Sequence, residues 1–289
     1  SVLTVPAINE RALAKIADLD CDAVIFDLED SVAPEKKAEA RQNLKEFLAQ
    51  TDLGWRERII RINGADSPYL SEDMALVLAL SPDAVLLPKV EEPGFVQDVA
   101  DLLADADATE RLRIWAMIET PGAILRIAEI AACTQDPATR LDCLVMGLND
   151  LAKETRARFT PDRAGMLPWL QSALIAARAH GLDILDGVCN RLEDMAAFEA
   201  ECRQGRDLGF DGKSLIHPAQ IAPANAIFAP DRDEVAQARE ILAAFALPEN
   251  AGKGVIALDG RMVERLHADM AERVVAVVEA IDGRAKAST

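Results

Sequence analysis

The chain has 289 residues, half of them apolar, and a formal net charge of −18 at pH 7. This length suits one large α/β-barrel domain or two smaller domains with cores of their own. The negative charge argues against nucleic acid or an anionic membrane as a partner, because their phosphates would be repelled over most of the surface. No apolar run reaches the roughly 18 residues of a membrane span, and the N-terminus does not resemble a signal peptide. We expect a soluble, cytoplasmic protein with reduced cysteines.

Short apolar, β-branched runs that end in turn residues recur along the chain. Eight such runs are predicted to be strands: residues 1–7, 22–30, 58–63, 83–90, 113–120, 142–150, 182–188 and 210–218. Most are separated by helical patterns: residues 10–19, 33–50, 93–106, 122–134, 166–181 and 194–209. Alternating strands and helices indicate parallel pairing, and eight units in about 220 residues fit a closed (β/α)₈ barrel better than an open sheet.

We therefore predict an α/β fold, with a (β/α)₈ TIM barrel over residues 1–221 as the catalytic domain. Residues 222–289 change character, with two helical stretches on either side of a glycine-bearing segment, "NAGKGVIALDGRM". They contain no ninth strand-helix unit. We expect this C-terminal helical extension to pack outside the barrel, to cover its mouth as a lid, or to reach a neighbouring subunit.

Polar residues follow nearly every predicted strand, where the residues of such a barrel face a common pocket. They are Asp27, Glu29, Asp30, Arg61, Asn63, Lys89, Glu119, Asp150, Asp186, Lys213 and His217. Carboxylates that converge on one dry pocket repel each other strongly unless a cation lies among them. The excess of acids predicts a cation-binding site at the mouth of the barrel.

Glu119 and Asp150 end successive strands, so their carboxylates can reach one small ion from adjacent sides. With oxygen ligands and no paired His or Cys nearby, the expected ion is Mg²⁺, or Mn²⁺ in its place. The alternative is that each acid only caps the helix that begins after it, near Pro121 and near Leu151.

Arg61 lies in an apolar stretch, "IIRIN", where a guanidinium is costly to bury without an anion. It is predicted either to neutralise Glu29 or Asp30, or to hold a substrate carboxylate or a developing enolate oxygen. The backbone at Gly122 and Ala123 opens a helix and offers N–H groups to a substrate carboxylate.

Two further features point to ligand contacts. Gly147 allows a ligand to approach the backbone closely. Arg11 and Lys15 have the i, i+4 spacing of one helix face, so together with Lys36 or Lys37 they are candidate phosphate contacts. A solvated helix face explains this pair equally well.

These segments together resemble the citrate lyase β-subunit/malyl-CoA lyase branch of the HpcH/HpaI aldolase/citrate lyase superfamily. The residues that carry the likeness include "DAVIFDLEDSVAPEKKAEAR", "LLPKVE", "IETPG", "GLNDLA" and "LGFDGKSLIHPAQI", and it extends over nearly the whole chain. The resemblance implies a modified (β/α)₈ barrel, a homotrimer or hexamer, that binds Mg²⁺ and a coenzyme A thioester.

The resemblance also implies roles for particular residues. Glu119 and Asp150 match the metal ligands, Arg61 matches the substrate-orienting arginine, and Arg11 and Lys15 fall where coenzyme A is contacted. The implied reaction is cleavage or formation of the C–C bond between a 2-oxo acid and acetyl-CoA, in a malyl-CoA, citramalyl-CoA or citryl-CoA type of thioester. A carboxylate from the C-terminal segment of a neighbouring subunit serves as the base.

That base is where this chain departs from the resemblance. "GRMVERL" stands where an aspartate is usual, so Glu264 takes its place with an arm longer by one methylene. A displacement of about 1 Å costs as much as ~10²-fold in rate where placement is critical. Alternatively, the longer arm activates water against the thioester carbonyl, which makes a thioesterase that yields malate and coenzyme A.

Two other functions remain as alternatives. A metal-dependent aldolase for free 2-oxo acids is disfavoured, because Asp30 stands where such enzymes place a histidine. A non-catalytic binding subunit is disfavoured because it would gain nothing from clustering Glu119, Asp150 and Arg61. We therefore expect a C–C lyase first and a thioesterase second.

Overall fold

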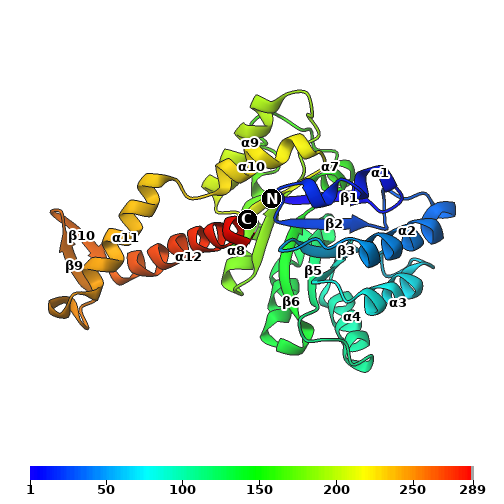
Figure 1. The fold of residues 1–289 in the computed structure, drawn as a ribbon, viewed down its shortest axis with the longest axis horizontal. Helices are drawn as coiled ribbons and strands as arrows, with labels where there is room; N and C mark the ends of the chain where they lie inside the picture. Colours follow the sequence, from blue (N-terminus) through cyan, green and yellow to red (C-terminus); the bar gives the residue numbers. More distant parts are fainter. Residues whose placement is uncertain (288–289) are drawn as a thin grey trace. The chain divides into compact units, whose positions relative to one another are not determined.

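The computed structural model describes residues 1–287 and shows the predicted α/β barrel. Eight parallel strands pair in chain order and close on themselves. Figure 1 shows several of these strands with helices around them. The strands are β1 (Val2–Pro6), β2 (Ala23–Asp27), β3 (Glu57–Arg61), β4 (Ala84–Leu87), β5 (Arg113–Ile118), β6 (Leu141–Met146), β7 (Asp183–Asp186) and β8 (Gly212–Leu215). All eight predicted strands are thus confirmed.

Side chains of alternate residues fill the inside of the barrel, because successive residues of a strand point to opposite faces. One buried cluster joins residues of seven strands: Val2, Ala23, Ile25, Ile59, Ala84, Leu86, Trp115, Met117, Cys143, Val145 and Leu185. The cluster closes the barrel centre to solvent. Polar chemistry is therefore confined to the ends of the strands.

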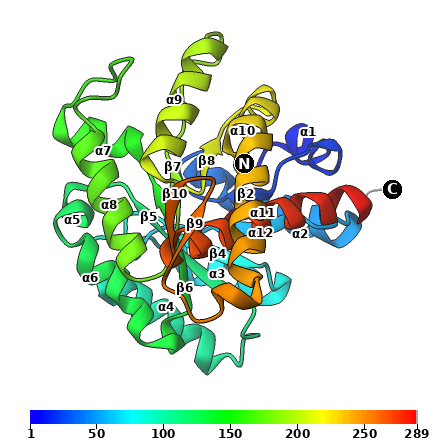
Figure 2. The same cartoon turned by 90° about the vertical axis from the view of Figure 1, so that its left-hand side faces the viewer.

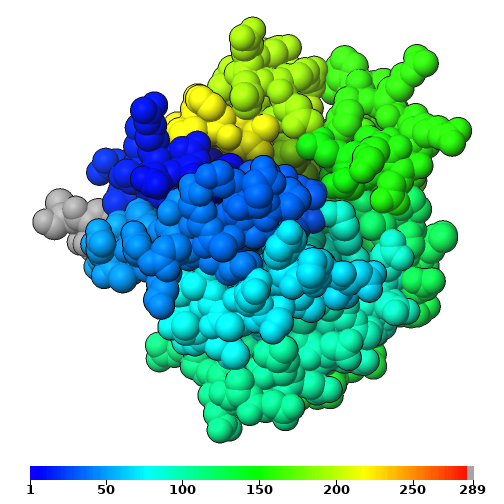
Figure 3. Space-filling view, turned by 90° about the vertical axis from the view of Figure 1, so that its right-hand side faces the viewer, coloured from blue at the N-terminus to red at the C-terminus, as the bar shows by residue number. Residues whose placement is uncertain are grey.

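Helices surround the barrel wall in the same order, so the colours in Figure 3 pass from blue through cyan to green across one face of the molecule. They are α1 (Glu10–Leu13), α2 (Lys37–Gln50), α3 (Leu70–Leu80), α4 (Pro93–Asp105), α5 (Pro121–Leu125), α6 (Ile127–Ala131), α7 (Leu148–Thr155), α8 (Leu167–Ala179) and α9 (Met195–Leu208). None of the helices described in residues 1–287 has the length and apolar character needed to cross a membrane.

Two predicted helices are shorter than their patterns indicate. Only one turn of the stretch 10–19 is α-helical, and a 3₁₀ turn at Ile16–Asp18 follows it. The stretch 122–134 breaks at Arg126, whose backbone (φ −115°, ψ 17°) leaves the helical region between α5 and α6. The Arg126 guanidinium donates to the carbonyl of Glu91 at 3.0 Å. The helix is thus interrupted at the residue that makes this tertiary contact, although arginine has a high intrinsic helix propensity.

The chain divides into two compact units, Ser1–Asn225 and Ala226–Thr289, and the division falls within α10 (Ile221–Phe228). The second unit holds α11 (Arg232–Ala246), a hairpin of β9 (Val255–Leu258) and β10 (Arg261–Glu264), and α12 (Arg265–Ala287), drawn in orange to red in Figure 2. Asp259 and Gly260 turn the hairpin with φ of 50° and 76°, which is the backbone of a type I′ turn. The core of the second unit includes Ile241, Phe245, Ile256 and Val263.

Asp186 and Lys213, two of the predicted pocket residues, lie outside the barrel wall instead. Leu185 belongs to the interior cluster, so the next residue, Asp186, faces the helices. Its carboxylate accepts from Arg163 at 2.8 Å and from Lys213 at 2.8 Å, and all three side chains are at most 1% exposed. Arg163 also donates to Gln204 of α9 at 2.7 Å. Glu201 of α9 lies 3.7 Å from Lys213, so four charged side chains form a buried structural network between wall and helix.

Removing the Asp186 charge from this network should be costly. We expect Asp186→Asn to lower the free energy of unfolding by about 3–5 kcal/mol, because Arg163 loses its carboxylate partner and Lys213 keeps only the longer contact with Glu201. The control is Asp142→Asn, which breaks the pair with Arg113 at 3.1 Å where both side chains are more than 40% exposed; such pairs contribute less than about 1 kcal/mol. Urea unfolding measures both variants, and equal losses would contradict the burial argument.

The same network predicts a pH dependence. Burial raises the pKa of Asp186, but Lys213 and Arg163 outweigh it, so the pKa lies below its ordinary value of 3.8. A lowered folded-state pKa gives stability that is present above the unfolded value and is lost as the pH falls through the folded one. The difference in unfolding free energy between wild type and Asp186→Asn should therefore shrink below about pH 4. A constant difference from pH 7 down to pH 2 would contradict it.

Candidate active site

Arg61 and Asp27 form the centre of a polar cluster at the carboxyl ends of the strands. The register of β2 and β3 places them side by side, and the Arg61 Nε and Nη2 atoms donate to the two oxygens of Asp27 at 2.6 Å each. Burial works against both charges, yet their mutual attraction lowers the pKa of Asp27 and raises that of Arg61. The guanidinium is thus held rigidly, with its Nη1 side free of Asp27.

Glu29 and Lys89 continue the cluster toward solvent. Lys89 Nζ donates to Glu29 Oε1 and lies 3.4 Å from Asp30, while Glu29 Oε2 is 3.5 Å from Arg61 Nη1. Burial raises the pKa of Glu29 although Arg61 and Lys89 oppose it. Sequence analysis offered Glu29 or Asp30 as the partner of Arg61, but the structure gives the principal role to Asp27 and only a longer contact to Glu29.

Glu119 follows β5 and is the most unusual acid of the site. It is 1% exposed, and its Oε1 accepts the backbone N–H of Lys89 at 2.8 Å. Burial raises its pKa to about 8, and the nearby charges of Arg61 and Lys89 do not offset this effect. A buried carboxyl group with a raised pKa is well suited to bind a cation, because the cation displaces the proton and stabilises the carboxylate.

Glu119 and Asp150 do not act as helix caps. The cap of α5 is Thr120, whose Oγ1 accepts from the Ala123 N–H at 3.1 Å. Asp150 lies within the first turn of α7, whose N-cap is Gly147 and has no side-chain cap bond. The capping alternative is therefore wrong for both acids. β5 and β6 pair through Ile118 and Met146; Glu119 directly follows β5, whereas Asp150 comes four residues after the end of β6.

Gly147 is required by its contact with Glu119. A Cβ atom built on it would lie 2.4 Å from Glu119 Cβ and 2.7 Å from Glu119 Oε2. Such a distance is far inside van der Waals contact, so any larger residue would move the Glu119 carboxylate. The sequence predicted a close approach at Gly147, and the group that approaches it here is this protein carboxylate.

The expected carboxylate seat at Gly122 and Ala123 is partly occupied by protein groups. The Ala123 N–H is already satisfied by Thr120. The Glu91 carboxylate lies 3.1 Å from the position of a Cβ built on Gly122. Because Glu91 is exposed, its side chain can leave without breaking a buried contact. The Ala123 N–H is therefore not available to a substrate carboxylate, and the Glu91 carboxylate lies close to Gly122.

The three expected phosphate contacts have different environments. Arg11 lies on α1 and Lys15 on the turn that follows it, and both are exposed. Lys37 is 6% exposed, and its ammonium donates to the Leu28 carbonyl, the Glu29 carbonyl and Asn63 Oδ1 at 2.7–2.8 Å. An ammonium has three protons, so none remains for a phosphate. This geometry corrects the expectation for Lys37.

A divalent cation fits the residues present. Within residues 1–287, no three His, Cys, Asp or Glu side chains gather as a complete set of metal ligands. Mg²⁺ does not require such a set, because it keeps several waters and binds through one or two carboxylates and substrate oxygens. Glu119 directly follows β5 and Asp150 lies in the first turn of α7, after the neighbouring strand β6, so both are candidate oxygen donors. The raised pKa of Glu119 marks a carboxylate whose burial is not offset by the nearby positive charges.

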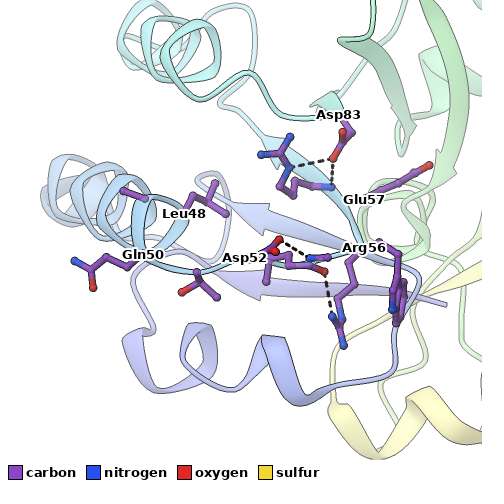
Figure 4. Close-up of a pocket in the computed structure, with 12 residues that line it drawn as sticks. Leu48, Gln50, Asp52, Arg56, Glu57 and Asp83 are labelled. Atoms are coloured by element: carbon purple, nitrogen blue, oxygen red, sulfur yellow. Dashed lines mark hydrogen bonds and ion pairs between the residues drawn. The ribbon is translucent and has the colours of Figure 1, made fainter. Parts of the chain in front are cut away.

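A large cavity of about 540 Å³ lies elsewhere, at the amino ends of the strands (Figure 4). It is lined by residues 48–58 and Asp83. Its arginines are committed to the fold: Arg56 donates to the carbonyls of Leu19 and Leu53, and Arg58 pairs with Asp83 at 3.1 Å. Because Arg61 ends the strand that Glu57 begins, this cavity is at the opposite end of the barrel from the polar cluster.

Comparisons with known proteins agree with this geometry. Residues 1–218 match the HpcH/HpaI aldolase/citrate lyase family. The chain belongs to this family. A (3S)-malyl-CoA thioesterase of Cereibacter sphaeroides is 47% identical over 281 residues, which cover 97% of this chain and 95% of the relative.

More distant relatives include lyases. An L-malyl-CoA/beta-methylmalyl-CoA lyase of the same species is 34% identical over 303 residues, covering 96% of this chain and 92% of that one. Among solved structures, CitE of Mycobacterium tuberculosis in complex with magnesium, acetoacetate and coenzyme A is similar with a TM-score of 0.76. It is 28% identical, and the match covers 95% of this chain and 96% of that one. The resemblance inferred from the sequence motifs is thereby confirmed.

The contact between Gly147 and Glu119 yields a test. Gly147→Ala should displace the Glu119 carboxylate and weaken binding of a divalent cation by about 10-fold or more. Mn²⁺ titration followed by electron paramagnetic resonance measures this affinity without an assay of activity. The control is Gly165→Ala, because a Cβ there meets nothing within 4 Å. Unchanged Mn²⁺ affinity in Gly147→Ala would show that Glu119 is not a ligand.

Proposed function

We propose that this chain is a Mg²⁺-dependent hydrolase of (3S)-malyl-CoA or a closely similar thioester, which it converts to malate and coenzyme A. The observation that carries the proposal is the 47% identity to a malyl-CoA thioesterase, which runs through 97% of the chain and so includes the second unit as well as the barrel. The motifs alone ranked C–C cleavage first. The sequence identity to the thioesterase, 47%, is higher than the identity to the lyase, 34%, and this comparison reverses that order.

Glu119 and Asp150 are proposed to hold the ion, with Mn²⁺ as a possible substitute. When bound, the ion polarises the thioester carbonyl as a Lewis acid. Glu119 contributes a buried, negatively charged oxygen at the point where solvent is excluded. Gly147 keeps that oxygen in place, because no side chain at position 147 competes for the space.

Arg61 is proposed to stabilise the negative charge that develops on the thioester oxygen. Its Nε and Nη2 atoms are fixed by Asp27 at 2.6 Å, so the remaining N–H groups are oriented before the substrate arrives. A donor that needs no reorganisation stabilises a transition state more than a mobile one. Asp27 is thus proposed as the residue that orients Arg61.

Glu264 is proposed to activate the attacking water. It ends β10, is half-buried, and its backbone N–H donates to His267 Nδ1 at 2.9 Å. In the balanced reaction, Glu264 takes a proton from water while the C–O bond forms. The C–S bond then breaks, the proton on Glu264 passes to the leaving thiolate, and the second proton of the water is lost when the new carboxyl group ionises. Arg11 and Lys15 are proposed to bind phosphates of coenzyme A, and the protein is proposed to be a homotrimer or hexamer.

The lyase reaction remains the second candidate. It is supported by the 34% identity to a malyl-CoA lyase over 96% of the chain. It would use the same metal ligands and the same arginine, because the enolate of the thioester carries its charge on the same oxygen.

The products decide between these functions. Purified protein incubated with (3S)-malyl-CoA and Mg²⁺ should release coenzyme A and malate, separated by chromatography. Acetyl-CoA with glyoxylate would make the protein a lyase. Neither pair, with Mn²⁺ shown to bind, would reject the substrate class. Glu119→Gln should lose Mn²⁺ binding and product formation together.

The position of the base is tested by mixing subunits. Arg61→Ala and Glu264→Ala should each be inactive alone. If Glu264 serves the site of a neighbouring subunit, oligomers formed by co-expressing the two variants should recover activity, because some sites then contain both residues. Mixed oligomers purified through two different tags and still inactive would contradict the shared site. Mn²⁺ affinity should be unchanged in Glu264→Ala, which separates loss of the base from loss of the metal.

A further inference from the structure

Lys37 occupies a position that neither the proposed reaction nor the family motifs explain. It is the first residue of α2, and its side chain turns inward so that only 6% is exposed. The ammonium meets three acceptors: the carbonyl of Leu28 at 2.8 Å, the carbonyl of Glu29 at 2.7 Å and Asn63 Oδ1 at 2.7 Å. The Tyr69 ring centroid lies 5.7 Å from the ammonium. Every proton is used, and every acceptor belongs to a loop of the candidate active site.

The first of these loops carries the acids around Arg61. It follows β2, and its backbone folds over Asp27, whose two oxygens accept the N–H groups of Glu29 at 2.9 Å and of Ser31 at 3.1 Å. These bonds hold the amide side of the loop. Lys37 holds its carbonyl side, at Leu28 and Glu29. The carboxylate of Glu29, which contacts Lys89 and Arg61, is therefore oriented by a backbone that Lys37 fixes.

The second loop follows β3 and is joined to the first by Asn63. Its Nδ2 donates to the Leu28 carbonyl at 3.0 Å and to Asp73 Oδ2, while its Oδ1 accepts from Lys37. Asp73 is fully buried on α3 and accepts from Arg41 at 2.8 Å. The ammonium thus lies where the β2 loop, the β3 loop and a buried ion pair between α2 and α3 converge.

We propose that Lys37 is a positioning residue for the catalytic cluster, which fixes the β2 loop so that Glu29, Lys89 and Arg61 hold their relative geometry. The inference rests on the proposed function for its kinetic consequence but not for its structural one. A lysine suits the position because a compact ammonium offers three donors in three directions, whereas an arginine offers a planar fork. Because its ammonium donates to three protein acceptors, Lys37 is proposed to act only through the loop.

The test compares Lys37→Met with Lys45→Met, which alters an exposed lysine of the same helix. In Lys37→Met we expect faster amide hydrogen exchange at residues 28–32, because two carbonyls and an amide lose their donor. We also expect kcat for coenzyme A release to fall about 10²-fold with a much smaller change in KM, as a shift of about 1 Å in catalytic groups would cause. Lys37→Arg should recover only part of kcat. Lys45→Met should match wild type in exchange and in kcat.

A coupling measurement sharpens the result. Because Asn63 and Lys37 hold the same loop, the Lys37→Met/Asn63→Ala double variant should lose far less activity than the product of the two single losses. Exchange at residues 28–32 and melting temperature are read on the same samples. Unchanged exchange in Lys37→Met, or a lowered melting temperature with kcat intact, would overturn the positioning role.

The two proposals can fail separately. Absence of any thioester product in wild type would remove the proposed function. The exchange difference between Lys37→Met and Lys45→Met would still decide whether Lys37 fixes the loop.

Discussion

A guanidinium inside a barrel of aliphatic side chains is stable only when an anion accompanies it, and Asp27 supplies that anion to Arg61. The pair forms because the register of β2 and β3 places the last residues of two neighbouring strands side by side. Two bonds of 2.6 Å use both carboxylate oxygens, and those oxygens also collect the N–H groups of Glu29 and Ser31. One ion pair thus orients both the Arg61 guanidinium and the loop that follows β2.

The other acids of the site differ in how many cations contact them directly. Glu29 shares its carboxylate between Lys89 and Arg61, whereas Glu119 has a backbone N–H and no directly bonded cation. Burial then decides the outcome, and the pKa of Glu119 rises to about 8. Glu119 is also one of the two acids proposed to hold the metal ion. A divalent cation bound there would supply the positive charge that the hydrogen bond from Lys89 does not.

Sequence analysis could predict the strands, because periodicity determines them, and it placed Asp27, Glu29 and Glu119 at or just after the carboxyl ends of strands, where the structure also has them. It could not assign neighbours such as Lys36 and Lys37, since both lie at the start of one helical pattern. In the structure Lys36 pairs with Glu39 at 49% exposure, while Lys37 is enclosed by two active-site loops. Nor could it place Asp186 and Lys213 outside the wall. A four-residue strand is compatible with either facing, and only the packed interior, with Leu185 inside, selects one.

Hydrolysis and C–C cleavage of a malyl thioester place their negative charge on the same oxygen. Water attack gives a tetrahedral oxyanion there, and loss of the 2-oxo acid gives an enolate there. On the proposed function, a metal held by Glu119 and Asp150 would serve either reaction together with Arg61 and would not select between them. Selection would then depend on which proton the base removes. A carboxylate at Glu264 could change that choice, because the length of its side chain would set the distance to water or to carbon. Relatives that have the same metal site but form different products would then differ in the carboxylate base and would stabilise the negative oxygen in the same way.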